Sequence, residues 1–149
     1  PPPTTPTPTS RCSSAASDVY KRQAETSECI NACHCTQCQR WTGGGPYLSV
    51  QVTDLEMQGE GRILAHHASE WGERGVCGTC GSTLYWRMQG RPYSNLAVGL
   101  LEDQSGLTVT SEIFVDYRPE WLAPFEGAEQ STEAEEMAKL DAFLAGETS

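Results

Sequence analysis

Residues 33–46 read CHCTQCQRWTGGGP and place Cys33, Cys35 and Cys38 in one short run. Cysteines two and three positions apart in a tight loop converge without a large loss of chain entropy, so this run can direct three sulfurs at one point. Three thiolates define three corners of a tetrahedral metal site. The glycines that follow lack the Lys and Ser/Thr of a phosphate-binding loop, so residues 43–46 are predicted to form a turn that lets the backbone approach the cysteines.

Cys77 and Cys80 form a second pair, in the segment CGTCG, whose small residues allow the backbone to wrap around a metal. The residues alone leave two arrangements open. This pair could share one closed structural zinc with Cys35 and Cys38, although the spacer of residues 39–76 is longer than is usual for such sites. Alternatively, the first run forms a separate three-thiolate site whose fourth position stays open, as is typical of a catalytic metal.

The chain around these cysteines is predicted to be mainly β, with small antiparallel sheets. Short segments rich in Val, Leu, Tyr and Trp are separated by Gly, Pro and Asp, and some alternate apolar with polar residues. The expected strands are Tyr47–Val52, Leu55–Gln58, Arg62–Ala65, Glu73–Val76, Thr83–Met88, Leu96–Leu101 and Thr110–Val115.

A helix is predicted at the C-terminal end of the sequence. Thr132 and Glu135 have the spacing of a capping box, apolar residues recur at helical spacing up to Leu144, and Gly146 supplies an end. The expected organisation is therefore a tail at 1–23, a zinc-binding domain at 24–126 and an acidic helix at 127–149. The tail begins PPPTTPTPTS, which favours disorder, and its residues 13–23 resemble translated adapter sequence, which indicates a non-native segment.

Composition excludes several classes of function. The formal net charge of -10 opposes binding to nucleic acid, whose phosphates a protein must neutralise. No apolar run is long enough to span a bilayer and no signal peptide is evident, so a cytoplasmic protein without membrane contact is expected. An odd total of 7 cysteines in such a protein favours metal ligation or thiol chemistry over paired disulfides.

Three segments together resemble one known family. ACHCTQCQRWTGGGPYLSV (32–50), SEWGERGVCGTCGSTLYW (69–86) and EIFVDYRPEW (112–121) are similar in order and spacing to the glutathione-dependent formaldehyde-activating enzymes, whose domain is shared with centromere protein V. The resemblance implies a zinc-binding β-tent fold. It also implies that the C-x-C-x-x-C thiolates of residues 33–38 hold a catalytic-type zinc.

A second, structural zinc is also implied by the resemblance. In the family it is held by the later C-x-x-C pair, here Cys77 and Cys80, together with an earlier C-x-C. Cys12 stands in that earlier motif, but Ser14 occupies its partner position. The resemblance therefore implies a structural site to which this chain contributes one cysteine fewer than the family pattern.

The function implied by the resemblance is reversible formation or cleavage of a carbon–sulfur bond, as in S-hydroxymethylglutathione from glutathione and formaldehyde. The expected partner is a small thiol or its aldehyde adduct. A non-catalytic zinc module that binds proteins or glutathione adducts stays open as an alternative, whereas a redox dithiol protein would need a βαβ context that the sequence does not predict. His34 is expected to point away from a metal held by its neighbours. Cys29 is expected to be a buried, inert thiol, with a spare metal ligand as the alternative.

Overall fold

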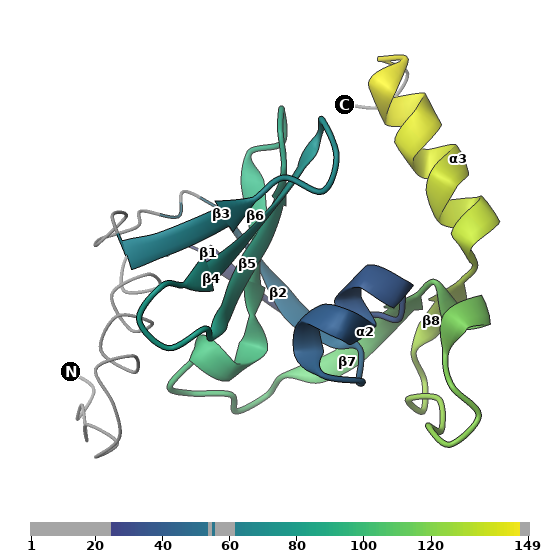
Figure 1. Cartoon of the computed structure of the whole chain (residues 1–149). Coiled ribbons are helices and arrows are strands. Elements are labelled where there is room, and N and C mark those ends of the chain that lie inside the picture. The colour runs from purple at the N-terminus through teal and green to yellow at the C-terminus, as the bar shows by residue number, and fades with distance from the viewer. Residues whose placement is uncertain (1–24, 54, 56–61, 147–149) are drawn as a thin grey trace. The chain divides into compact units, whose positions relative to one another are not determined.

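The computed structural model describes residues 25–53, 55 and 62–146 and confirms the mainly β class with a C-terminal helix (Figure 1). The predicted tail at 1–23 lies outside the described residues, as do Cys12, Ser14 and most of the predicted strand Leu55–Gln58. Within the described ranges, no helix is long and apolar enough to cross a membrane.

The fold divides into two compact units. The described part of the first, the antiparallel unit, comprises residues 25–28, 49–53, 55 and 62–106. The described part of the second, the cysteine unit, comprises residues 29–48 and 107–146. Each unit has its own strand pairing and its own buried residues.

Strands of the antiparallel unit pair in the order β3-β4-β5-β6-β2. These are β2 (Tyr47–Thr53, of which Ser49–Thr53 belongs to this unit), β3 (Ile63–His66), β4 (Gly72–Cys77), β5 (Thr83–Met88) and β6 (Tyr93–Ala97). The core of this unit includes Val50 and Val52, which alternate along β2, together with Leu84 and Tyr85 of β5 and Leu96 of β6. This is the antiparallel architecture that the alternating sequence pattern predicts.

One predicted strand of this unit is displaced. The apolar run Leu96–Leu101 is not a strand along its length, because β6 ends at Ala97 and Val98–Leu100 forms a 3₁₀ turn (η2) closed by Leu101 N donating to Val98 O at 3.1 Å. The strand begins earlier, at polar positions such as Ser94 that nevertheless face the interior. Because the sequence pattern marks buried positions by apolar residues, a buried serine such as Ser94 does not mark the start of the strand. The predicted strand therefore begins too late.

The cysteine unit pairs its strands in parallel. β1 (Glu25–Cys33) runs beside β7 (Thr108–Ile113) in a register from Cys29↔Thr108 to Cys33↔Ile113, and β7 runs beside β8 (Glu129–Ser131). The expected small antiparallel sheets therefore describe the first unit only. Parallel partners lie far apart in sequence, so no local turn signal announces them.

The helices of the cysteine unit are α2 (Thr36–Thr42) and α3 (Glu133–Leu144), with a short 3₁₀ turn, η3 (Val115–Tyr117), after β7. The predicted capping box of α3 is confirmed, since Thr132 Oγ1 accepts from Glu135 N and Glu135 Oε2 accepts from Thr132 N at 2.7 Å.

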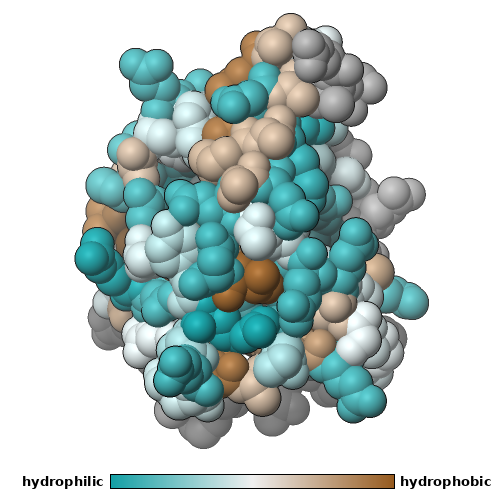
Figure 2. Space-filling model, turned by 90° about the vertical axis from the view of Figure 1, so that its right-hand side faces the viewer, coloured by the Kyte–Doolittle hydropathy of each residue, from teal (hydrophilic) through white to brown (hydrophobic). Residues whose placement is uncertain are grey.

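Most of the face seen in Figure 2 is hydrophilic, in keeping with the high net charge.

Candidate metal centre

The first cysteine of the run is the last residue of β1, and the second follows it by two residues. Beyond Cys33 the chain stays extended and is held to β7, because His34 N donates to Ile113 O at 3.0 Å. Side chains alternate between the two faces of an extended chain. Cys33 and Cys35 therefore share one side, while His34 points to the other.

The third cysteine is supplied by the first turn of α2. Cys35 is the N-cap of this helix, and its Sγ accepts a hydrogen bond from Cys38 N at 3.4 Å. The C-x-x-C spacing is thus the spacing between an N-cap and the third helical residue, which folds back over the cap. This short helix is not predicted by the apolar pattern, since Cys38 is its one buried residue.

The predicted glycine turn ends α2. Gly43 has φ 89° and Gly44 has φ 131°, in the left-handed region that glycine adopts at little cost. A β-carbon at either position would meet no atom within 4 Å among the described residues. The turn is confirmed, but the glycines serve backbone conformation rather than the close approach that the sequence suggested.

The structure brings the three cysteines together. The Sγ atoms of Cys33, Cys35 and Cys38 lie within 4.8 Å of one another, with Cys33 and Cys38 buried and Cys35 half-buried. Sulfurs around a tetrahedral zinc at about 2.3 Å would be separated by roughly 3.8 Å. The soft donor set and its spacing therefore fit a thiophilic metal ion, and the cluster could hold one.

Crowding of these sulfurs affects their acidity. Hydrogen bonds with the thiols of Cys35 and Cys38, followed by burial, raise the pKa of Cys33 well above its usual value. A second negative charge beside the first is unfavourable in a buried position unless a cation compensates it.

The second cysteine pair lies in the antiparallel unit and is not part of this cluster. Cys77 is a buried free thiol at the end of β4. Cys80 is exposed in the following turn, where its Sγ lies 3.0 Å from Ser82 Oγ, and it is disulfide-bonded, so the expectation against disulfides is wrong at this residue. Gly81 N donates to Cys77 O at 2.7 Å and Gly81 has φ 79°, so the tight turn depends on glycine, as predicted. The third predicted ligand, Cys12, lies outside the described residues.

The prediction for Cys29 is wrong. This residue is exposed rather than buried, at the first paired position of β1, opposite Thr108, which is also exposed. The strand enters the protein interior only at Ala32, after a register shift between Ile30 and Asn31.

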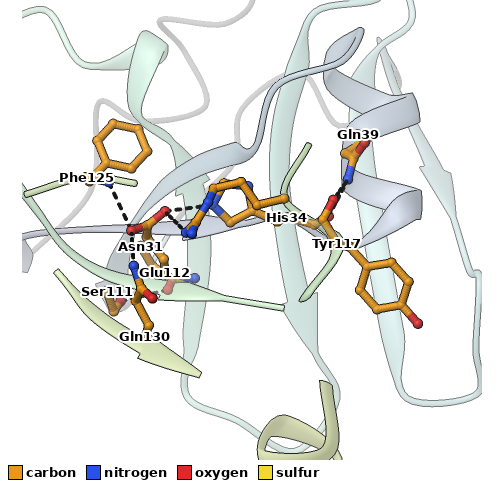
Figure 3. Close-up of polar contacts among 9 residues, drawn as sticks. Asn31, His34, Gln39, Ser111, Glu112, Tyr117, Phe125 and Gln130 are labelled. Atoms are coloured by element: carbon orange, nitrogen blue, oxygen red, sulfur yellow. Dashed lines mark hydrogen bonds and ion pairs between the residues drawn. The ribbon is translucent and has the colours of Figure 1, made fainter. Parts of the chain in front are cut away.

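A buried carboxylate beneath the cysteine run was not identified from the sequence. His34 and Glu112 are both fully buried, and His34 Nε2 lies 2.9 Å from Glu112 Oε1 (Figure 3). The same carboxylate accepts hydrogen bonds from Arg118 at 3.2 Å, Phe125 N at 3.0 Å and Gln130 Nε2 at 3.3 Å. The expectation that His34 points away from the ligand cluster is confirmed.

Electrostatics keep this carboxylate ionised. Burial alone would raise the pKa of Glu112, but the hydrogen bonds from His34, Phe125 and Gln130, together with the charge of Arg118, bring it below its usual value. An ionised carboxylate only accepts hydrogen bonds, so His34 Nε2 carries the proton that it shares. The sequence feature that could have pointed to this buried carboxylate is the position of Glu112 inside the predicted strand Thr110–Val115.

Gln39 joins the cysteine run to η3. Its Nε2 donates to His34 O at 2.7 Å and to Tyr117 O at 2.9 Å, as Figure 3 shows. The turn that presents Tyr117 follows Phe114, which has the positive φ of 57° that is uncommon outside glycine. Near the end of α2, the ring of Trp41 packs against that of Tyr47 with centroids 4.7 Å apart.

Comparison with known proteins assigns the family. The model of the glutathione-dependent formaldehyde-activating enzymes matches residues 7–117. The chain belongs to the glutathione-dependent formaldehyde-activating enzyme family. An uncharacterized lyase of Schizosaccharomyces pombe is 26% identical to this formaldehyde-activating family member over 94 residues, which are 61% of this chain and 67% of the yeast protein. The resemblance recognised in the sequence is therefore confirmed.

Proposed function

We propose that this protein is a zinc-dependent carbon–sulfur lyase that acts on thiol–aldehyde adducts such as S-hydroxymethylglutathione. Family membership and the lyase name of the yeast relative support a lyase-type enzyme. The observation that carries the proposal is the convergence of three sulfurs with no fourth His, Cys, Asp or Glu ligand in their cluster, among the residues that the structure describes. Three protein ligands and an exchangeable fourth position are typical of catalytic zinc.

Cys33, Cys35 and Cys38 would hold the zinc ion. When bound there, zinc would supply Lewis-acid stabilisation to a substrate sulfur or carbonyl oxygen. Burial of Cys33 and Cys38 shields the cluster from water, and partial exposure of Cys35 leaves one side from which a small molecule can approach.

The reaction is balanced without any further reactant. In the cleavage direction the carbon–sulfur bond breaks with its electron pair leaving on sulfur, and the adduct's hydroxyl oxygen forms the carbonyl. The hydroxyl proton is transferred to the sulfur, so that the products are a free thiol and an aldehyde. Condensation of the two reverses each step.

The proposal includes a second, structural zinc at Cys77 and Cys80, with Cys12 as a further ligand. The burial of Cys77 and the glycine-dependent turn after it are compatible with such a site. Because Cys80 is disulfide-bonded in the structure, zinc would bind there only after that bond is reduced. The proposed location is the cytoplasm, where reduced thiols persist.

The test combines metal analysis with kinetics on the full chain. Bound zinc and its sulfur ligands would be counted by X-ray absorption, and exchange between glutathione, formaldehyde and their adduct would be followed by NMR above the spontaneous rate. Cys35→Ser should lose both the exchangeable-site zinc and the added rate, whereas Cys29→Ser, at an exposed cysteine outside the cluster, should keep both. Full acceleration by zinc-depleted protein would refute zinc dependence, and bound zinc without acceleration would favour a non-catalytic module.

A further inference from the structure

We infer that Glu112 and His34 are positioning residues that hold the three-cysteine cluster in its metal-binding arrangement. This inference rests on the proposed function, because it assumes that Cys33, Cys35 and Cys38 bind a metal. It assigns a role in the affinity and geometry of that site to a buried hydrogen-bonded pair, formed by Glu112 on β7 and His34 directly after β1.

The connection runs through the backbone of the cysteine run itself. His34 lies between two of the cysteines, and both its main chain and its ring are tied to β7: its N donates to Ile113 O, and its Nε2 contacts Glu112 Oε1 at 2.9 Å. Since alternate residues face opposite sides, fixing the His34 ring on one face fixes the direction of both cysteine side chains on the other.

The surroundings of Glu112 form a socket for a negative charge. Its Oε1 accepts hydrogen bonds from His34 and Arg118, and its Oε2 accepts them from Phe125 N and Gln130 Nε2 (Figure 3). Each of these four partners is a hydrogen-bond donor. A glutamine in the same place would have to turn its own NH₂ group toward two of these donors in either orientation. The socket therefore specifies a carboxylate and not merely the shape of its side chain.

Chemistry explains why a metal site benefits from such an anchor. Partners that orient the ligands of a metal typically change affinity by about 10–100-fold when they are removed. The three cysteines come from a strand end and the start of a helix, and His34 adds a side-chain contact with β7 to the backbone pairing of Cys33 with Ile113. Loss of the anchor should leave the thiols present but less well converged.

The experiment measures cobalt(II) binding to the metal-free full chain. The thiolate-to-cobalt and d–d absorption bands that Cys35→Ser removes are assigned to the cluster, and their titration gives its affinity. Glu112→Gln is expected to weaken this affinity by about 10–100-fold and to shift the d–d bands, which report ligand geometry. Gln130→Ala, at an exposed residue that supplies one donor to the socket, is expected to cause a smaller loss of about threefold.

Glu73→Gln is the matched control. Glu73 lies on β4 in the antiparallel unit, is largely buried, accepts from Tyr85 OH at 2.6 Å and pairs with Arg87 at 2.8 Å. The same chemical change there should lower stability and leave the cluster's affinity within twofold of the unchanged protein.

The outcomes separate the two claims. Unchanged affinity and unchanged bands in folded Glu112→Gln would overturn the inference alone, as would an equal loss in the Glu73→Gln control. If Glu112→Gln does not fold, Gln130→Ala decides, and wild-type affinity in that variant overturns the inference. If Cys35→Ser removes no band, the cluster binds no metal, and the proposed function falls together with the inference.

Discussion

Gln39 offers a direct test of how α2 is held against the cysteine run. Its Nε2 makes two hydrogen bonds, to His34 O at 2.7 Å and to Tyr117 O at 2.9 Å. His34 is fully buried, so truncation to alanine leaves its carbonyl oxygen without this partner, whereas Tyr117 is exposed and can bond to water instead. The first contact should therefore account for most of the effect.

The magnitude follows from these two contacts. An unsatisfied buried acceptor costs about 1–3 kcal/mol and the exposed contact about 0.5 kcal/mol, while alanine regains a few tenths of a kcal/mol of helix propensity. Gln39→Ala should therefore lower the free energy of unfolding by about 2 kcal/mol, or Tm by roughly 4–8 °C for a chain of this size. Urea unfolding at neutral pH, followed by tryptophan fluorescence, measures this change.

Gln39→Glu is the decisive companion variant. Glutamate has nearly the same length and helix propensity as glutamine, but its carboxylate cannot donate and would face two carbonyl oxygens. It should destabilise the protein at least as much as alanine does. If Gln39→Glu unfolds at the same urea concentration as the unchanged protein, the two hydrogen bonds do not hold α2 and the reasoning is wrong.

Three further changes should affect stability in defined directions. Thr132→Ala removes the cap that accepts from Glu135 N and should cost about 1 kcal/mol of unfolding free energy in urea; an unchanged midpoint would contradict the capping box. Gly75→Ala places a β-carbon 2.2 Å from the buried ring of Tyr85 and should cost about 1–3 kcal/mol or more, seen as a lower Tm; wild-type Tm would show that the ring moves freely. Glu112, whose pKa is lowered on folding, stabilises the protein above the ordinary carboxyl range, so the stability advantage over Glu112→Gln should shrink as pH falls through that range; an advantage constant from pH 7 to 3 would disprove this.

The fold could be predicted wherever its signals are local. Alternating apolar residues gave β2 and β5 close to their true bounds, and the Thr132 capping box gave α3. The parallel pairing of β1 with β7 could not be predicted in this way, because it depends on contacts between residues such as Cys33 and Ile113 that no short segment contains.

The candidate site also has parts that local sequence predicts and parts that depend on contacts between distant residues. The three sulfurs could be predicted because their convergence is set by a strand end and one helical turn within residues 33–38. Glu112 could not be predicted as a partner of His34, because a buried carboxylate is stable only once Arg118, Gln130 and the Phe125 N–H surround it. A glutamate inside a predicted strand was the one visible sign.

The affinity of the site for a metal depends on both local and distant parts of the sequence. The donor atoms are encoded within a few residues, whereas their orientation depends on a hydrogen bond between His34 and Glu112, whose sequence separation is 78. A change at Glu112 or Gln39 leaves the C-x-C-x-x-C motif intact in the sequence and still alters how firmly its sulfurs are held. Because affinity for a metal depends on that convergence as well as on the thiolates, the cysteine motif alone does not determine how well the centre binds its ion.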